Sequence, residues 1–238
     1  MTDSDNPRRV LLKLSGEAFG GGKVGIDTQV IRRIAEEIVP AVQQGVQVAI
    51  VVGGGNFWRG RSSGSMDRTR ADHVGMLATV MNALALQDAF EHNDVPCRVM
   101  SAIQMNEICE PYIRRRAINH LSKGNVVIFA AGSGNPYFTT DTAAALRACE
   151  IGAEILIKAT KVDGIYDKDP VKCSDAVRFD KITYHEVLVR GLQVMDSTAT
   201  ALCQDNRMPI LVLNIDGEDT VKCALAGEPV GTLVYQED

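Results

Sequence analysis

The stretch VLLKLSGEAFGGGKVGID, residues 10–27, joins a short apolar run to a run of glycines. Val10 to Leu14 has the composition of a buried strand, yet Lys13 places an ammonium group inside it. Burying a charge costs free energy unless an opposite charge meets it. The stretch therefore predicts a strand whose end faces an anion, and the identity of that anion bears directly on function.

The pattern of short strand, polar or glycine-rich exit and longer helix recurs along the chain. Further strands are expected at 46–52, 97–100, 126–130, 155–159, 210–213 and 232–235. Helices are expected between an N-cap at Asp27 and a stop at Gly45, and over 71–92, 111–121, 141–151, 184–190 and 197–206. Thr183, with Glu186 three residues later, has the spacing of a capping box. Strands that are apolar on both faces and alternate with helices predict an α/β protein, a three-layer αβα sandwich with a mainly parallel central sheet.

Composition narrows the class of protein. The 238 residues, with 45% hydrophobic and 23% charged side chains, suit one globular domain. A net charge of −5 argues against a nucleic-acid binder. The six cysteines form no CxxC pair, which favours reduced thiols over disulfides or a zinc site. The start of the chain has no apolar signal region, and no segment reaches the roughly 20 apolar residues of a membrane span, so we expect a soluble cytoplasmic protein without a membrane partner.

Four predicted strands end in loops that carry glycines or polar residues, at 13–22, 53–60, 131–141 and 160–170. In open α/β sheets ligands bind beyond the carboxyl ends of the strands, and glycines there let backbone N–H groups approach anionic oxygens. Together with Lys13, Arg59 and Lys161, these loops predict a polyphosphate ligand. A P-loop is excluded because Lys23 is followed by valine, and GGGNFWRG does not match the dinucleotide fingerprint.

Five segments in order resemble the bacterial uridylate (UMP) kinases of the amino-acid-kinase superfamily: LLKLSGEA (11–18), GGGNFWRG (53–60), ADHVGMLATVMNALAL (71–86), GSGNPYFTTDTAA (132–144) and KATKVDGIYDKDP (158–170). The similarity runs from about Val10 to Leu233. Ser133 and Tyr137 replace the family's usual threonine and phenylalanine, and the loop FGGGKVG (19–25) is peculiar to this chain.

The resemblance implies ATP-dependent phosphorylation of UMP to UDP in pyrimidine nucleotide biosynthesis, by direct in-line transfer. It implies a single domain (residues 1–238) whose N-terminal half binds UMP and makes subunit contacts, while its C-terminal half binds ATP. Mg²⁺ is expected to be held mainly by the ATP phosphates and water, so we predict no protein metal ligand.

The resemblance also assigns residues. The implied catalytic residues are Lys13, Lys161, Asp141 and Asp196, with the lysines clamping the transferred phosphoryl group and the carboxylates orienting them. Those implied for ATP are Lys13, Leu14, Ser15, Gly16, Gly55, Arg59, Thr160, Tyr166 and Asp169. Those implied for UMP are Gly54, Arg59, Asp72, Ser133, Gly134, Asn135, Pro136, Tyr137, Phe138, Thr139 and Thr140. On this basis we expect Lys13 to meet the transferred phosphoryl group, with no protein anion as its main partner.

The helix predicted over 71–92 is apolar on more than one side, and the resemblance implies that it forms a dimer interface within a homohexamer. It further implies GTP as an activator and UTP as an inhibitor. Two other functions stay open: a kinase of the same fold that acts on a carboxylate or carbamate, and a nucleotide-binding regulator without chemistry. The regulator would have predicted loss of Lys13 or Asp141, and both are present.

Overall fold

The computed structural model describes residues 8–58, 65–170, 172–173 and 175–237. Its centre is a single sheet with the strand order β4-β3-β5-β2-β1-β6-β8-β9-β7. The strands are β1 (Arg9–Leu14), β2 (Gln47–Val52), β3 (Cys97–Ser101), β4 (Glu110–Pro111), β5 (Val126–Ala130), β6 (Ile155–Thr160), β7 (Lys181–Thr183), β8 (Ile210–Asn214) and β9 (Thr232–Tyr235). All neighbouring pairs are parallel except β8 with β9, which confirms the mainly parallel sheet.

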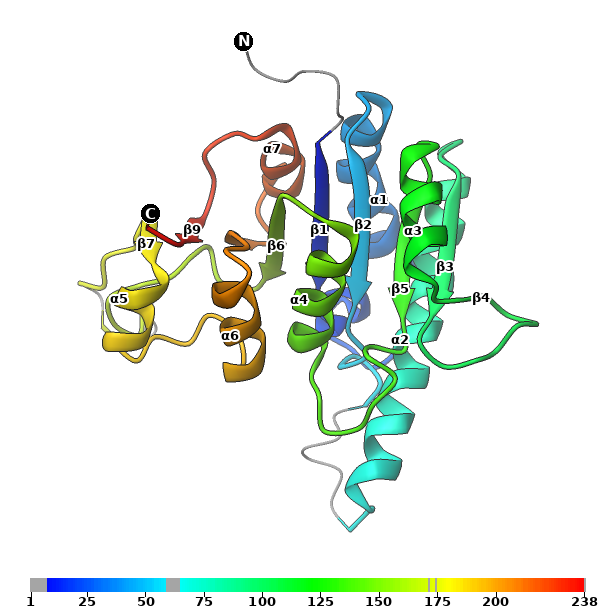
Figure 1. Ribbon diagram of the computed structural model, residues 1–238, viewed down its shortest axis with the longest axis horizontal. Coiled ribbons are helices and arrows are strands. Elements are labelled where there is room, and N and C mark those ends of the chain that lie inside the picture. The colour runs from blue at the N-terminus through cyan, green and yellow to red at the C-terminus, as the bar shows by residue number, and fades with distance from the viewer. Residues whose placement is uncertain (1–7, 59–64, 171, 174, 238) are drawn as a thin grey trace.

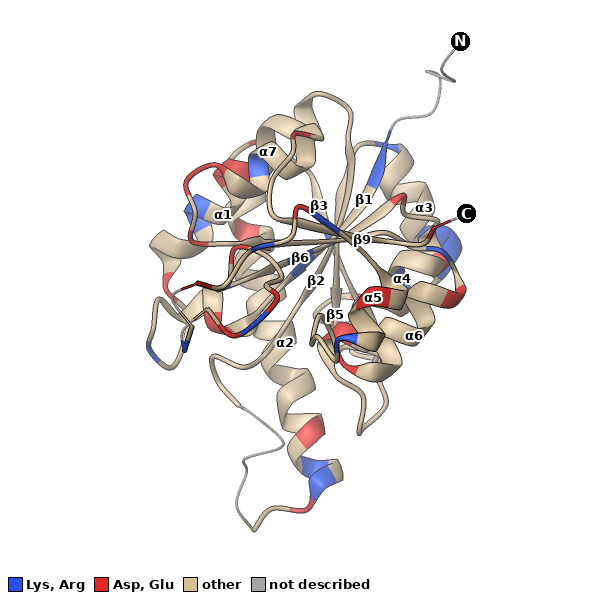
Figure 2. Ribbon diagram, turned by 90° about the vertical axis from the view of Figure 1, so that its left-hand side faces the viewer, with Lys and Arg blue, Asp and Glu red and all other residues tan. Residues whose placement is uncertain are grey.

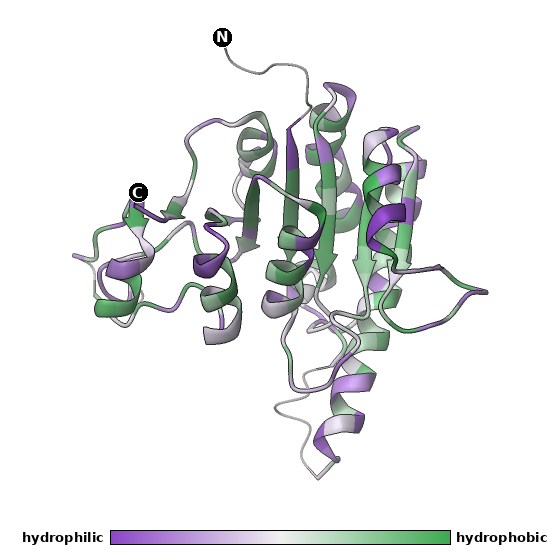
Figure 3. Ribbon diagram, viewed as in Figure 1, coloured by the Kyte–Doolittle hydropathy of each residue, from purple (hydrophilic) through white to green (hydrophobic). Residues whose placement is uncertain are grey.

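Helices cover both faces of this sheet (Figure 1). They are a 3-10 turn, η1 (Gly16–Gly20), and α1 (Thr28–Gln43), α2 (Arg68–Glu91), α3 (Arg114–Ser122), α4 (Thr140–Ile151), α5 (Tyr184–Val189), α6 (Ser197–Asp205) and α7 (Thr220–Ala226). Most charged residues lie on these helices and on the loops (Figure 2), while the strands between them are mainly apolar (Figure 3). The predicted three-layer αβα sandwich is confirmed.

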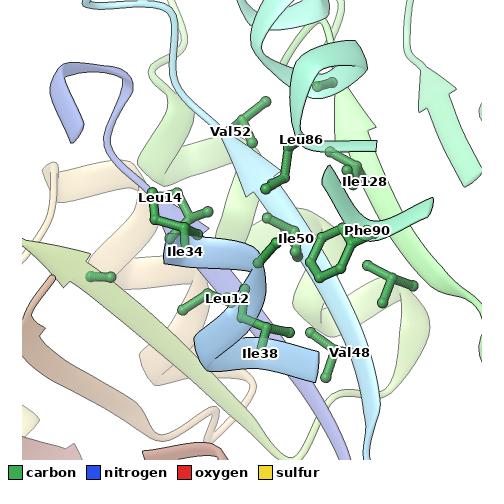
Figure 4. Packing of buried hydrophobic residues seen from close by; sticks show 14 of the residues in the cluster. Leu12, Leu14, Ile34, Ile38, Val48, Ile50, Val52, Leu86, Phe90 and Ile128 are labelled. Carbon is green, nitrogen blue, oxygen red and sulfur yellow. The ribbon is translucent and has the colours of Figure 1, made fainter. Parts of the chain in front are cut away.

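Alternation along β1 divides the core into two layers. Val10, Leu12 and Leu14 pack with residues of α1, α2 and α7 in one buried cluster, part of which is seen in Figure 4. Leu11 belongs to the second cluster, beneath α3, α4, α5 and α6. Because successive side chains of a strand point to opposite faces, Lys13 shares the face of Leu11 and lies on the α4 side.

Local signals in the sequence explain both ends of α1 and the start of α5. Asp27 caps α1 by accepting hydrogen bonds from the backbone N–H groups of Gln29 and Val30, and Gly45 follows the helix at a φ of +91°. The capping box before α5 is confirmed, with Thr183 and Glu186 each accepting from the other's backbone N–H.

Two predicted helix starts were wrong. The helix expected from residue 71 begins at Arg68, because Asp67 caps it by accepting from the backbone N–H of Arg70. The helix expected from residue 111 begins at Arg114, because Pro111 pairs with Ser101 in β4. The sequence also missed the short elements η1, β4, β7 and α7. Within the described residues, no helix combines the length and apolar character needed to cross a membrane.

Candidate active site

Three cavities follow one another along the edge of the sheet where the parallel strands end. The first, the α2 cavity, has a volume of about 540 Å³ and lies between α2, the loop after β2 and the loop after β5. The second, the central cavity, measures about 990 Å³ and shares Thr139 and Thr140 with the first. The third, the β6-loop cavity, measures about 510 Å³ and shares Lys158 with the second.

A carboxylate bound by two lysines lies in the central cavity. Lys13 on β1 and Lys158 on β6 are direct neighbours in the parallel register, so both side chains point to the face beneath α4. Asp141, in the first turn of α4, meets Lys13 Nζ with Oδ1 at 2.8 Å and Lys158 Nζ with Oδ2 at 2.9 Å. Lys158 Nζ also donates to the Val194 carbonyl at 2.6 Å. We call these three side chains the Lys-Asp-Lys group.

The electrostatics of this group favour an anionic ligand. Burial alone would raise the pKa of Asp141, but the ammonium groups of Lys13 and Lys158 outweigh it and hold that pKa below its usual range. One ionised carboxylate between two ammonium groups leaves a net charge of +1. The N-terminus of α4 adds the positive end of its dipole at the same place.

The expectation that Lys13 has no protein anion as its main partner was wrong. Strand alternation turns Lys13 toward the first turn of α4, where Asp141 pairs with it. Sequence reasoning also missed Lys158, although this residue resembles Lys13 in being a lysine within an apolar strand. Lys161 instead lies 3.9 Å from Glu17, with 58% of its side chain exposed. The structure thus brings Lys158, rather than Lys161, to Asp141, and a catalytic role of Lys161 stays a prediction.

Asp196 ties the starts of two helices together. Its carboxylate caps α6 by accepting from the Ala199 N–H at 3.0 Å, and it accepts from the hydroxyl groups of Thr139 and Thr142. Thr139 in turn caps α4 by accepting from the N–H groups of Asp141 and Thr142. Asp196 lines the central cavity, and its contacts hold the helix start that carries Asp141.

The glycines after β1 and β2 bring backbone segments into close contact. A Cβ on Gly16 would lie 2.3 Å from the Gly55 nitrogen, and a Cβ on Gly54 would lie 2.6 Å from the Gly75 carbonyl oxygen on α2. Any larger residue would therefore push the two strand exits apart or lift α2. These glycines fix the walls of the cavities, a reason for their presence that the sequence reasoning did not include.

The loop after β5 forms a wall of the α2 cavity. Asp72 on α2 accepts hydrogen bonds at Oδ2 from the Tyr137 backbone N–H and from Arg68 Nε, both at 2.8 Å. Arg68 and Trp58 also line this cavity, and neither was predicted. Among the described residues, the buried Trp58 Nε1 has no hydrogen-bond partner.

The structure gathers most of the predicted UMP residues around the α2 cavity. Its lining includes Gly54, Asp72, Ser133, Asn135, Phe138, Thr139 and Thr140. Gly134, Pro136 and Tyr137 complete the same loop. Arg59 lies outside the described residues.

The predicted ATP residues are more dispersed. Thr160, Tyr166 and Asp169 line the β6-loop cavity, where the Tyr166 hydroxyl donates to Asp163 at 2.8 Å. Lys13 lines the central cavity and Gly55 the α2 cavity. Leu14 is fully buried in the core, and Ser15 and Gly16 form the turn that follows it. Within the part of the chain that the structure describes, no three His, Cys, Asp or Glu side chains are placed to hold a metal ion.

Comparison with known proteins identifies a family and several similar structures. The amino acid kinase family profile matches residues 8–214. A UMP kinase from Bacillus anthracis superposes with a TM-score of 0.93 at 37% identity, over 98% of each chain. A UMP kinase from Ureaplasma parvum gives 0.92 at 38% identity, over 97% of this chain and 100% of the other. A uridylate kinase from Archaeoglobus fulgidus gives 0.70 at 29% identity, over 95% of this chain and 99% of the other. The predicted family resemblance is confirmed.

Proposed function

The chain belongs to the amino acid kinase family, and from this premise we propose that it transfers the γ-phosphoryl group of ATP to UMP, producing UDP and ADP. The observation that carries the proposal is the Lys-Asp-Lys group, which lies in the cavity between two others of nucleotide-compatible size. The similar structures from Bacillus anthracis and Ureaplasma parvum are described as UMP kinases.

The row of cavities supports one arrangement of the two substrates. UMP occupies the α2 cavity, and ATP places its base in the β6-loop cavity beside Tyr166. Their phosphates then meet in the central cavity, at Lys13 and Lys158. This division matches a UMP-binding N-terminal half and an ATP-binding C-terminal half within one domain.

Catalysis of phosphoryl transfer depends mainly on positioning the two substrates and on cations near the charge that develops in the transition state. Asp141 holds the two ammonium groups apart on its two oxygens, so each keeps N–H donors for phosphate oxygens. In this mechanism neither lysine forms a covalent bond, and the γ-phosphoryl group passes directly from ATP to the acceptor. Asp196 contributes by fixing Thr139 and thereby the start of α4.

The described residues do not provide a protein cage for Mg²⁺. Both carboxylates of the central cavity are already engaged, Asp141 by lysines and Asp196 by threonine hydroxyls. We therefore assign Mg²⁺ to the ATP phosphates and water, and derive no step through it.

Subunit contacts through α2 form part of the proposal. Val74, Leu77 and Met81, spaced as neighbours on one side of that helix, are 38%, 53% and 44% exposed. Such a stripe is typical of a face that a second copy covers. From the family resemblance we also propose that the protein forms a homohexamer, is activated by GTP, is inhibited by UTP and is located in the cytoplasm.

One assay separates the proposed activity from its alternatives. ADP release is measured with UMP, CMP, aspartate, acetylglutamate and carbamate as acceptors. We expect turnover with UMP and much less with CMP, because a site that pairs with the uracil carbonyl leaves a polar group unpaired against the cytosine amino group. Turnover with an acid acceptor alone would indicate the carboxylate or carbamate kinase. Nucleotide binding without turnover would indicate the regulator, and no turnover with UMP refutes the proposal.

A further inference from the structure

One carboxylate oxygen joins the start of α2 to the loop after β5. Asp72 Oδ2 accepts from Arg68 Nε on its own helix and from the backbone N–H of Tyr137, which is 65 residues away in sequence. The Arg68 guanidinium carbon also lies 5.3 Å from the centroid of the Tyr137 ring. We call Arg68, Asp72 and Tyr137 the Asp72 latch. Figure 1 shows this end of α2 projecting from the body of the fold.

The loop held by the latch has an unusual backbone. Tyr137 has a φ of +73° and Ala131 a φ of +61°, both in the left-handed region that non-glycine residues avoid. Such a conformation persists only where its surroundings enforce it. The hydrogen bond from the Tyr137 N–H to Asp72 constrains Tyr137, and the Arg68 guanidinium lies over its ring.

Besides its contact with the Tyr137 ring, Arg68 neutralises a negative charge in the α2 cavity. Arg68 and Asp72 are the charged side chains among the described residues that line this cavity. A nucleoside monophosphate brings a phosphate with a charge of about −1.5 to −2 at neutral pH. Without Arg68, the uncompensated charge of Asp72 would disfavour the entry of an anionic nucleotide into this cavity, whereas the pair together is neutral.

We propose that Arg68 is a positioning residue for the acceptor nucleotide, which acts by neutralising Asp72 and by keeping the loop over residues 132–140 closed on the bound ligand. The inference rests on the proposed function, since it takes a nucleoside monophosphate as the ligand of the α2 cavity. It assigns a role to a side chain that the sequence motifs left unassigned.

The geometry also predicts which kinetic constant responds. Thr139, at the end of the latched loop, is held separately by Asp196, which also binds Thr142. The start of α4 and Asp141 therefore keep their positions when the latch is broken. Loss of Arg68 should therefore weaken the binding of UMP, while the affinity for ATP and the turnover rate at saturating UMP change little.

The test compares Arg68→Gln and Arg68→Lys with Arg70→Gln, which removes an exposed arginine two residues along the same helix that is not among the lining residues of the α2 cavity. Steady-state assays give the KM for UMP, the KM for ATP and kcat. Binding of UMP is measured independently by fluorescence of Trp58, the only tryptophan of the chain, which lines the same cavity.

For Arg68→Gln we expect the UMP KM and Kd to rise about 10- to 100-fold, the range of one lost hydrogen bond to a charged group. The ATP KM and kcat should stay within about threefold, and Arg70→Gln should match the wild type. Arg68→Lys should recover only part of the affinity, because lysine keeps the charge but lacks the planar fork.

An unchanged UMP affinity in Arg68→Gln would overturn the inference, as would equal losses for UMP and ATP. The fluorescence titration separates this result from the proposed function. If the wild type binds UMP without phosphorylating it, the kinase proposal fails, while the binding comparison still decides the role of Arg68.

Discussion

Replacing Asp141 with asparagine removes a charge from the Lys-Asp-Lys group and keeps the size of the side chain. The ammonium groups of Lys13 and Lys158, now 2.8 and 2.9 Å from carboxylate oxygens, would lose their shared counter-charge. Both lysines would then repel each other across adjacent strands. We expect them to move apart, and the phosphoryl group to lose its ordered pair of cations.

The size of the effect follows from burial. Removing one partner of a fully buried ion pair costs about 3–5 kcal/mol. The three side chains keep 11–15% exposure and border a cavity, so water compensates part of the loss. We expect the free energy of unfolding to fall by about 1–3 kcal/mol. For catalysis, loss of a preorganised electrostatic contact lowers kcat about 100- to 1000-fold.

Two measurements on Asp141→Asn check these values: ADP release under saturating UMP and ATP, and urea unfolding. Asp27→Asn is the matched control, because it makes the same change at the N-cap of α1, where asparagine also caps well. The KM for UMP should change only a few-fold, since Asp141 is not among the lining residues of the α2 cavity. A kcat within threefold of the wild type would refute the catalytic role of the group.

The same substitution has a defined pH dependence. The two ammonium groups overcome the effect of burial and depress the pKa of Asp141 in the folded state. A depressed folded pKa stabilises the protein above the unfolded value, which is about 4, and this stability is lost as the pH falls through the folded pKa. The difference in unfolding free energy between wild type and Asp141→Asn should therefore be largest near pH 7 and shrink below about pH 4. A difference that stays constant down to pH 3 would contradict this assignment.

Four further substitutions test other parts of the structure. Gly54→Ala should lower the thermal midpoint, because its Cβ would lie 2.6 Å from the Gly75 carbonyl oxygen and overpacking costs about 1–3 kcal/mol. Gly75→Ala has open space at its Cβ, so it should raise the thermal midpoint by the equivalent of about 1 kcal/mol through better helix propensity. Equal shifts for both would contradict the packing argument. Tyr184→Phe removes a buried hydroxyl that donates to the Met208 carbonyl at 2.6 Å, and should cost about 1–3 kcal/mol in urea unfolding, whereas an unchanged midpoint would show that the bond contributes nothing. Lys158→Met should lower kcat at least about tenfold with little effect on the KM for UMP, and an unchanged kcat would remove Lys158 from the transfer site.

The sequence predicted the layers of the fold because the strands are short, apolar and separated by clear helix signals. Its failures have local causes. The two residues of β4 and three of β7 are too short for any periodicity, and each forms one edge of the sheet. The starts of α2 and α3 were displaced because Asp67 was not recognised as a cap and Pro111 was not recognised as part of a strand.

The candidate site was predictable to the level of loops but not of partners. Alternation along β1 places Lys13 on one face of the sheet, yet only the tertiary fold shows that α4 begins over that face. Lys158 was missed because the loop lysine, Lys161, stands in the more conspicuous glycine-containing segment. In this chain, a lysine within an apolar strand indicated the site better than a lysine in a glycine-containing loop, because a buried charge requires a partner.

The start of α4 explains why the α2 cavity and the central cavity can act as one site. Thr139 lines both the α2 and the central cavity, and it caps the helix whose first turn carries Asp141. Asp196 holds that cap from the side of α6, while the lysines hold Asp141 from the sheet. A ligand in the α2 cavity and one at the lysines therefore contact the same helix terminus from two directions. Asp141 therefore compensates the buried charge of Lys13 within its apolar strand, and under the proposed function Lys13 would share that pairing with a phosphate when substrates bind.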